Sequence, residues 1–528
     1  MYLQVDAKRY RCVYYMQIQL VLSGLYRKCL ADRSRTPLKA KQLVFIKECR
    51  RAMSKLYFVV GSQDLYGEEC LKQVAEDSKV MVDFLNEQLK GTVEVELLPT
   101  VETSDICVKD MRIVENDDDC VGVITWMHTF SPAKMWIKGL QILQKPLLHL
   151  HTQANEKLPY DEIDMDFMNL NQAAHGDREY GFILARLHVV HEVVAGYYRH
   201  EKVVAKIRQF AQVAKAIAES KNTRIATFGN NMRDVAVTDG NRLECQIRYG
   251  WEVKYWGIGE IVKLADAATD AEVDAKMKEY TDKYTMATDN VEAVREQARY
   301  EVAFEKFFAE NGITAFTDTF QDLFGMNQLP GIAAQNLMGK GFGFGPEGDY
   351  KIAALGSIMM KMAEGREGAT GFIEDYTYDM TPGEELELAS HMLEVPVTLA
   401  AGKPEIQVHH LGIGGKADPA RLVFDGVTGD GIQVTLVDMG DHFRIICADI
   451  ELVKQPQPMP KLPVARIMYR HKPNFEIGTA AWCYAGGAHH SVVSTALTRA
   501  DIALFAKLTG TEFIAIGDDT TEADLQKM

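Results

Sequence analysis

The sequence predicts an α/β protein built of two α/β domains and a β-rich C-terminal domain. Its 528 residues, 47% of them hydrophobic, are too many for a single core and suit roughly three domains. Short apolar runs alternate with stretches of helical periodicity, which is typical of parallel α/β sheets. Past about residue 400 the pattern changes to β-branched segments separated by turns. We place the domains at 53–223, 224–369 and 370–528, after a separate stretch at 1–52.

Residues 1–52 differ from the rest of the chain in charge. They hold twelve Lys and Arg against three acidic residues, a net charge of +9, whereas the whole chain carries −16. Their apolar run from Val13 to Tyr26 is too short to span a membrane, and no small-residue cleavage site follows it. Met53 then precedes SKLYFVVGSQ, which predicts a first strand. We therefore expect the fold to begin at Met53, with a basic extension before it that is mis-assigned or dispensable.

Each domain is predicted from its own run of elements. In the first, Leu56–Val60 predicts a strand and 71–89 a helix, and the further elements are strands at 93–98, 121–127 and 146–151 and a helix at 133–143. The second domain begins at Arg224 and contains a long helix over 291–312, followed by the buried strand ITAFTDTF. In the last domain, turn signals separate three segments spaced for antiparallel pairing, at 421–424, 432–438 and 442–452.

Composition limits the ligands and partners. A net charge of −16 and a pI of about 5.4 argue against nucleic acid or an anionic membrane, and favour a small neutral or cationic ligand. The nine cysteines form no C-x-x-C pair, which excludes a zinc knuckle and argues against a disulfide scaffold. Reduced thiols and a cytoplasmic location are expected.

Two glycine-rich stretches do not predict a nucleotide site. In 339–345 the glycines fall at every second residue, so a dinucleotide-binding motif that starts at Gly339 or Gly341 lacks its third glycine. The stretch 410–417 lacks the leading glycine of a P-loop and the Ser or Thr that would hold magnesium. Alternate glycines allow the backbone to approach either a neighbouring strand or a small ligand, and both alternatives remain open at this point.

Four polar side chains lie in apolar surroundings: Glu347, Glu374, His391 and His490. Buried acids need a partner because desolvation opposes ionisation. Any one buried histidine is more often a hydrogen-bonded core residue than a metal ligand. The intervals of 27, 17 and 99 residues match no local metal motif, so spacing alone does not bring these four together.

Ten segments of the chain resemble the L-arabinose isomerase family, and they are collinear from about Met53 to near the C-terminus. They are GSQDLYG (61–67), WMHTFSPAKMWIKGLQ (126–141), IDMDFMNLNQAAHGDRE (163–179), NNMRDVAVTDG (230–240), LPGIAAQNLM (329–338), PEGDYKIAAL (346–355), FIEDYTY (372–378), SHMLEV (390–395), HLGIGGKADPARL (410–422) and AGGAHH (485–490).

The resemblance implies a homohexamer of subunits with two Rossmann-like α/β domains and a C-terminal β-barrel-like domain. It implies interconversion of L-arabinose and L-ribulose through an enediol, with D-galactose and D-tagatose as a possible second pair. The family's metal positions match Glu347, Glu374, His391 and His490. Two carboxylates and two imidazoles suit Mn²⁺, with Co²⁺ or Mg²⁺ as substitutes. Glu347 and Glu374 are also the implied acid and base, in an order that the sequence does not assign.

The resemblance extends to contacts with the sugar. Gln63, Met232 and Phe320 match positions that line the family's pocket, although Met232 and Phe320 would equally suit core packing. His175 matches a position that reaches the site from a neighbouring subunit. The chain has no recognisable counterpart for 1–52 and stops where the family continues with an aromatic-rich tail, so we expect weaker assembly or stability, with the chemistry intact.

Two other functions remain open. A related isomerase of the L-fucose type would use the same four side chains. A non-catalytic sugar-binding protein could also be built from two α/β domains, but binding a neutral sugar does not require a metal held by two carboxylates. The sequence does not decide between L-arabinose and D-galactose, or between metals.

Overall fold

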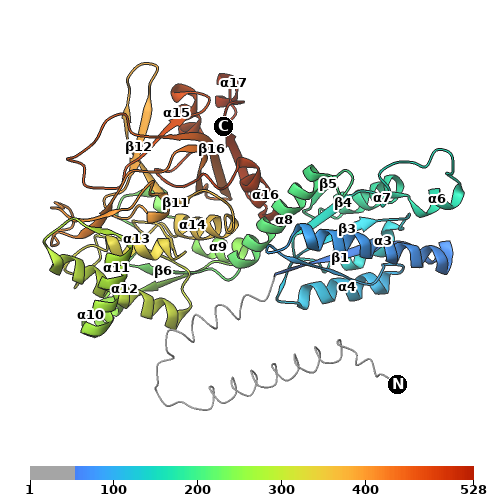
Figure 1. Ribbon diagram of the computed structural model, residues 1–528, viewed down its shortest axis with the longest axis horizontal. Helices are drawn as coiled ribbons and strands as arrows, with labels where there is room; N and C mark the ends of the chain where they lie inside the picture. The colour runs from blue at the N-terminus through green and yellow to red at the C-terminus, as the bar shows by residue number, and fades with distance from the viewer. Residues whose placement is uncertain (1–53) are drawn as a thin grey trace, which may run out of the picture. The chain divides into compact units, whose positions relative to one another are not determined.

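The computed structural model describes residues 54–528 (Figure 1). The expected extension at 1–52 and its boundary at Met53 lie outside this range. Within it, the predicted class is confirmed: two parallel-sheet α/β domains precede a C-terminal β-barrel domain.

The N-terminal domain contains a five-stranded parallel sheet in the order β2-β1-β3-β4-β5. Its strands are β1 (Lys55–Gly61), β2 (Glu94–Leu97), β3 (Cys120–Met127), β4 (Leu147–His151) and β5 (Glu192–Ala195). Its helices are η1 (Asp64–Tyr66), α3 (Gly67–Gln88), α4 (Ser104–Asn116), η2 (Ala133–Trp136), α5 (Ile137–Leu140), α6 (Met165–Leu170), α7 (Ala173–Arg186) and α8 (Glu201–Ser220). All eight residues of β3 are buried, as expected for an inner strand with both faces covered.

The helix expected over 133–143 is the one clear difference in this domain. The chain there forms only the 3-10 turn η2 and the single helical turn α5. Gly139 packs so closely on α4 that a Cβ atom would meet Cys107 Sγ at 2.3 Å. Glycine also destabilises a helix when it lies in the interior of the helix, so this segment is suited to close packing and not to a long helix.

The central domain contains a four-stranded parallel sheet in the order β10-β9-β6-β7. Its strands are β6 (Arg224–Phe228), β7 (Glu252–Trp256), β9 (Ala315–Asp318) and β10 (Gly343–Phe344). Its helices are η3 (Ala236–Thr238), α9 (Arg242–Tyr249), α10 (Gly259–Asp266), α11 (Asp270–Lys283), α12 (Val291–Asn311), α13 (Ile332–Gly339) and α14 (Tyr350–Met362). The long predicted helix is α12, which Asn290 caps and Gly312 ends in a left-handed conformation.

Six antiparallel strands of the C-terminal domain close into a barrel in the order β15-β18-β11-β12-β17-β16, because β15 also pairs with β16. They are β11 (Thr370–Asp379), β12 (Leu386–Ser390), β15 (Gly429–Asp438), β16 (Phe443–Val453), β17 (Ile467–His471) and β18 (His490–Ser494). The strand β19 (Glu512–Ile516) adds to β16 in parallel. The helices of this domain are η4 (Val397–Leu399), α15 (Phe475–Tyr484), α16 (Arg499–Thr509) and α17 (Glu522–Leu525).

One predicted strand lies outside the barrel. The segment expected at 421–424 is β14 (Ala420–Val423), which pairs with β13 (Glu405–Val408) and not with β15. β13 in turn pairs in parallel with β8 (Thr285–Met286), which is a short strand from the preceding part of the chain. The three strands form a small separate sheet.

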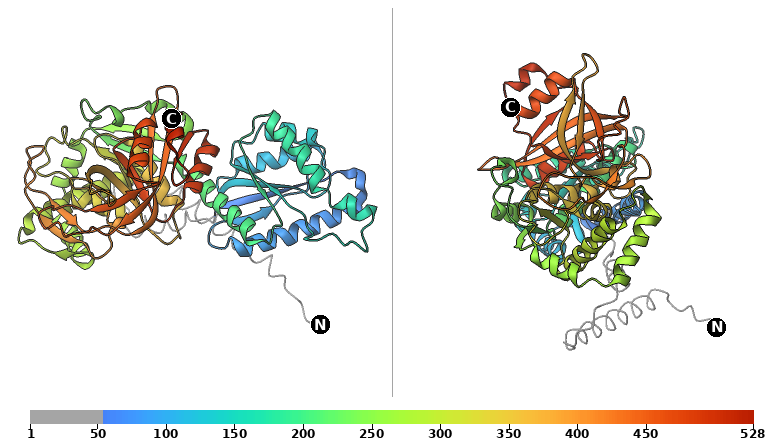
Figure 2. Two further views of the ribbon diagram at one scale, coloured as in Figure 1. Left: turned by 90° about the horizontal axis from the view of Figure 1, so that it is seen from above. Right: turned by 90° about the vertical axis from the view of Figure 1, so that its left-hand side faces the viewer.

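The helix α8 joins the N-terminal sheet to the rest of the fold. It contacts β3 and β5 as well as α14 and α16, and it buries Ile207, Phe210 and Ala211 in a core that reaches the central domain. In the right-hand view of Figure 2, the orange and red strands of the barrel lie above the green and yellow elements of the central domain. In the part of the chain that is described, no helix has the length and apolar character needed to cross a membrane.

Candidate metal centre and active site

Two glutamates and three histidines converge where the barrel meets the central domain. Glu347 lies in the turn between β10 and α14, and Glu374 lies on β11. His391 directly follows β12, and His490 opens β18 after His489. In the barrel, Glu374 is paired in register with His490 on one side and with Ser390 on the other. Strand pairing thus brings together side chains whose sequence intervals match no local motif.

The charged and imidazole atoms of this cluster face one another at distances longer than a hydrogen bond. His391 Nε2 lies 3.5 Å from Glu374 Oε2, and His490 Nε2 lies 3.9 Å from Glu347 Oε2. His489 Nε2 lies 3.9 Å from Glu347 Oε2 and 3.8 Å from Glu374 Oε1. Such spacings suit donor atoms arranged around a shared cation.

His490 provides the sharpest test of whether a metal fits. Its side chain is fully buried, and its Nε2 atom has no hydrogen-bond partner among the described residues. A buried polar atom left without a partner costs roughly 1–3 kcal/mol, so native structures rarely keep one. The atom lies 3.9 Å from Glu347 Oε2, and a set of two oxygen and two nitrogen donors fits a divalent ion.

His490 and His391 are each held by a further carboxylate at Nδ1. His490 Nδ1 lies 3.2 Å from Asp349 Oδ2, and His391 Nδ1 lies 2.5 Å from Glu394 Oε2. When Nδ1–H donates to a carboxylate, the lone pair of a neutral imidazole is on Nε2, where a metal can take it. Asp349 is itself fixed, because it caps α14 and contacts the buried Lys351.

The turn that carries Glu347 is tightly constrained. Glu347 has φ 61°, a left-handed conformation that few residues other than glycine adopt. Its carbonyl accepts a hydrogen bond of 2.8 Å from the backbone N–H of Met232. A Cβ atom at Gly348 would meet Asn231 Cα at 2.5 Å, so the turn lies directly against the loop that follows β6. This loop therefore sets the position of the Glu347 carboxylate.

The alternate glycines before this turn serve packing. A Cβ atom at Gly343 would meet the carbonyl of Ala353 at 1.9 Å, and one at Gly345 would meet the carbonyl of Asp349 at 2.3 Å. These glycines let α14 approach β10 closely and so place Asp349 behind His490. The sequence left open whether the glycines allow a close approach to neighbouring backbone or to a small ligand. At Gly343 and Gly345 it is the neighbouring backbone.

Burial and charge shape the protonation of the cluster. Burial raises the pKa of Glu347, but contact with His489 and the charges of His490 and His391 outweigh it, and the pKa is lowered overall. Burial lowers the pKa of His391, but Glu394, Glu374 and Glu347 raise it to about 9. Contact with Glu347 raises the pKa of His489. The negative charge of the carboxylates therefore dominates the cluster, which attracts cations.

The four expected sugar-contacting residues fall into two groups. Met232 and Phe320 lie beside the turn that carries Glu347. The backbone N–H of Met232 donates to the Glu347 carbonyl, and Phe320 lies two residues after Asp318, whose carbonyl accepts a hydrogen bond from the Gly348 N–H. Both side chains are half-buried. Gln63 and His175 belong instead to the N-terminal domain, at the end of β1 and on α7. Residues 54–528 contain no hydrogen bond or ion pair from either of these two side chains to the cluster.

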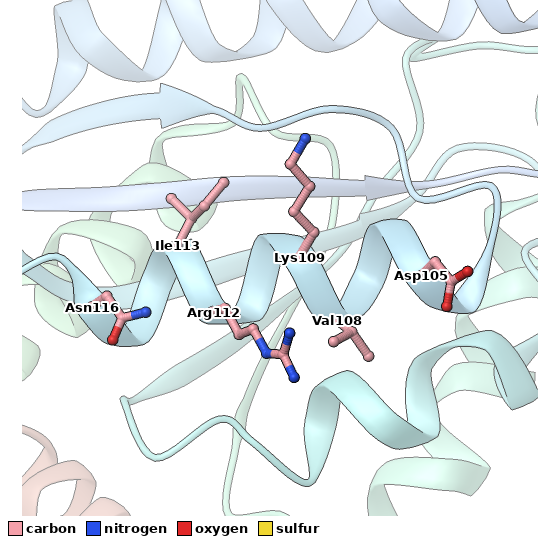
Figure 3. Close-up of a pocket in the computed structure, with 6 residues that line it drawn as sticks. All are labelled: Asp105, Val108, Lys109, Arg112, Ile113 and Asn116. Carbon is pink, nitrogen blue, oxygen red and sulfur yellow. The ribbon is translucent and has the colours of Figure 1, made fainter.

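A separate hollow of about 540 Å³ runs along α4, and Figure 3 shows its six lining side chains on that helix. They are Asp105, Val108, Lys109, Arg112, Ile113 and Asn116. With one acid and no histidine or cysteine, this surface lacks the donors that metal binding or acid–base chemistry requires.

Three family models match the chain in sequence order. They are the L-arabinose isomerase N-terminal domain at 50–222, the central domain at 224–365 and the C-terminal domain at 369–512. The chain belongs to the L-arabinose isomerase family. The L-arabinose isomerase of Oceanobacillus iheyensis is 49% identical over 468 residues, covering 88% of this chain and 98% of the relative. That of Thermotoga petrophila is 46% identical, covering 90% of this chain and 96% of the relative.

Four residues of this L-arabinose isomerase family member were missed by reasoning from the sequence: His489, Asp349, Glu394 and Asp318. Asp349 and Glu394 lie two and three residues after Glu347 and His391, which is a local signal that could have indicated them. Asp318 is buried at the end of β9, with Oδ2 unpartnered among the described residues. Burial, with a contribution from Glu394, raises the pKa of Asp318 to about 8.

Proposed function

We propose that the protein interconverts L-arabinose and L-ribulose at a divalent-metal centre formed by Glu347, Glu374, His391 and His490. Membership of the L-arabinose isomerase family supports the reaction. The observation that carries the site is the meeting of these side chains from separate elements, with His391 facing Glu374 and His490 facing Glu347. Among the described residues, the buried Nε2 of His490 has no hydrogen-bond partner there. The mixed donor set favours Mn²⁺, with Co²⁺ or Mg²⁺ as substitutes.

A bound divalent ion supplies a Lewis acid that polarises the oxygens on C1 and C2 of the sugar. The residues of the chain do the rest. One carboxylate of the pair Glu347 and Glu374 removes the C2 proton and returns it to C1 through an enediol. The other moves a proton between O1 and O2, so no proton or electron is gained or lost overall. His489 Nε2, 3.9 Å and 3.8 Å from the two carboxylates, can hydrogen-bond to either as its charge changes.

We further propose that a neighbouring subunit completes the site, in a homohexamer. Met232 and Phe320 line the pocket from the chain that holds the metal, whereas Gln63 and His175 come from the N-terminal domain of another copy. Large apolar side chains are exposed on the segments around His175: Leu65 at 80%, Tyr160 at 81%, Met165 at 64% and Met168 at 53%. Exposed apolar surface of this kind is typical of a protein interface.

Ketose formation from a panel of sugars tests the proposed reaction. The protein is stripped with EDTA and assayed on L-arabinose, L-fucose and D-galactose before and after addition of Mn²⁺, Co²⁺ or Mg²⁺. We expect no ketose without metal and L-ribulose as the main product with Mn²⁺. Faster turnover of L-fucose would indicate an isomerase of that type. Sugar binding without turnover by the Mn²⁺-loaded protein would contradict catalysis altogether.

Asp349→Asn is expected to weaken Mn²⁺ binding by about 10–100-fold, because the neutral amide no longer holds His490 with Nε2 free for the metal. The kcat at saturating Mn²⁺ should stay close to that of the wild type. Mn²⁺ titrations followed by activity and by calorimetry measure both quantities. Asp441→Asn is the matched control, since Asp441 Oδ1 contacts His442 Nδ1 at 2.5 Å in an exposed pair. Unchanged Mn²⁺ affinity in Asp349→Asn would exclude this role.

A further inference from the structure

A second group of potential metal ligands lies in the N-terminal domain. His149 and His151 are two residues apart near the end of β4, so their side chains extend from the same face of the strand. Asp177 on α7 lies between them. Its Oδ1 is 3.2 Å from His149 Nε2, and its Oδ2 is hydrogen-bonded to His151 Nδ1. One carboxylate and two imidazoles thus meet where the parallel strands end.

His149 lacks a hydrogen bond on the atom that faces this group. Only 3% of the residue is exposed, and its Nε2 has no hydrogen-bond partner among the described residues despite the nearby Asp177 oxygen. Its Nδ1 is already engaged by Thr125 Oγ1 on the adjacent strand, at 3.2 Å. The ring of Tyr180 packs beside His149 with centroids 4.9 Å apart. Because Nδ1 of His149 is already engaged, its buried Nε2 is stabilised most simply by a ligand that accepts the nitrogen lone pair.

The group is open to solvent on one side. Whereas His149 and Asp177 are buried, 38% of the His151 side chain is exposed. A hollow of about 360 Å³ adjoins it, with Gln153, Asn155 and Glu156 among the lining residues. An ion could enter from this hollow, and water or another ligand could take a remaining coordination position there.

We propose that His149, His151 and Asp177 form a second divalent-metal site, one that prefers Zn²⁺ or Co²⁺. Two imidazoles and one carboxylate, with a position open to solvent, are the donor set of many tetrahedral zinc sites. The Glu347 cluster offers two carboxylates and is better suited to Mn²⁺, so the two sites differ in their preferred metal. The ion replaces the hydrogen bond between His151 and Asp177 with two bonds to metal. It also fastens α7, which carries His175, to β4.

Cobalt titration of the full chain tests this site separately from the first. The protein carries His391→Gln and His490→Gln to disable the first cluster, is stripped with a chelator, and is titrated with Co²⁺ alone. We expect one Co²⁺ per chain by elemental analysis, with the strong visible absorption of a tetrahedral ion and a higher Tm. Adding His151→Gln should reduce the bound Co²⁺ from one per chain to none. This residue is partly exposed, so the substitution leaves the core intact.

Two further variants make the result decisive. Asp177→Asn keeps the size of the side chain and should also abolish Co²⁺ binding. His191→Gln removes a half-buried histidine of the same domain whose Nδ1 lies 2.7 Å from the Val189 carbonyl oxygen, and it should leave binding unchanged. Folding of each variant is checked by circular dichroism. A folded parent protein that binds no Co²⁺, or binding that survives both His151→Gln and Asp177→Asn, would overturn the proposal.

Discussion

Replacing Glu374 or Glu347 by Gln is expected to lower kcat on L-arabinose by about 10³-fold, the usual scale for loss of a positioned acid–base group. The amide keeps the size of the side chain but can neither accept the sugar proton nor contribute negative charge to the metal site. Both side chains are largely buried, with Glu347 12% and Glu374 16% exposed, and among the described residues neither forms an ion pair with a Lys or Arg. The neutral amide can still hydrogen-bond to the neighbouring imidazoles, so the fold should persist. Initial rates of L-ribulose formation at saturating Mn²⁺ measure the effect.

The metal content of each variant separates the two roles of these carboxylates. A variant that retains Mn²⁺ but has a lowered kcat has lost proton transfer. A variant that has lost bound Mn²⁺ as well as activity has lost a metal ligand. Glu384→Gln is the matched control, because it makes the same change at a side chain that is 72% exposed in the turn between β11 and β12. It should turn over like the wild type. A Glu374→Gln protein with wild-type kcat would contradict the proposed mechanism.

Much of the architecture follows from local patterns in the sequence. The run of apolar residues in β3 and the capped periodicity of α12 depend on neighbours within the same segment, and both elements are found where they were expected. The closed barrel depends on a local pairing between β15 and β16, which follow one another along the chain. It depends equally on the pairing between β11 and β18, which joins residues more than a hundred positions apart. The turn signals between these segments predict antiparallel strands, whereas only the family resemblance predicts the barrel.

Two of the residues missed at the site, His489 and Asp318, depend on features of the fold that residue spacing does not show. Neighbouring residues of a strand face opposite sides, so His490 as a ligand would direct His489 away. In the structure β18 begins only at His490, and His489 lies in the bend before it, which frees its ring to face the two carboxylates. Asp318 reaches the cluster through the order of the central sheet, where β9 pairs with both β6 and β10. Neither relation can be read from residue spacing.

Co-assembly of two inactive variants is expected to restore activity if His175 acts across subunits. A His175→Ala chain retains an intact metal cluster, and a Glu374→Gln chain retains an intact His175. In a mixed form of the proposed hexamer, a cluster from the first chain can meet His175 from the second. Random mixing of equal amounts completes roughly a quarter of the sites. Chains carrying two different tags are co-expressed, the hybrids are purified through both tags, and L-ribulose formation is compared with that of each parent.

The matched control pairs Glu374→Gln with His391→Gln. Both substitutions fall in the cluster that one chain builds by itself, so every cluster in that hybrid remains defective and no activity should return. Recovery in the first hybrid alone would therefore locate His175 and the metal cluster of one site in different chains. It would also explain why, within residues 54–528, the His175 and Gln63 side chains form no hydrogen bond or ion pair with the cluster of their own chain. If the first hybrid stays as inactive as its parents while gel filtration shows intact hexamers, then His175 does not complete a neighbour's site.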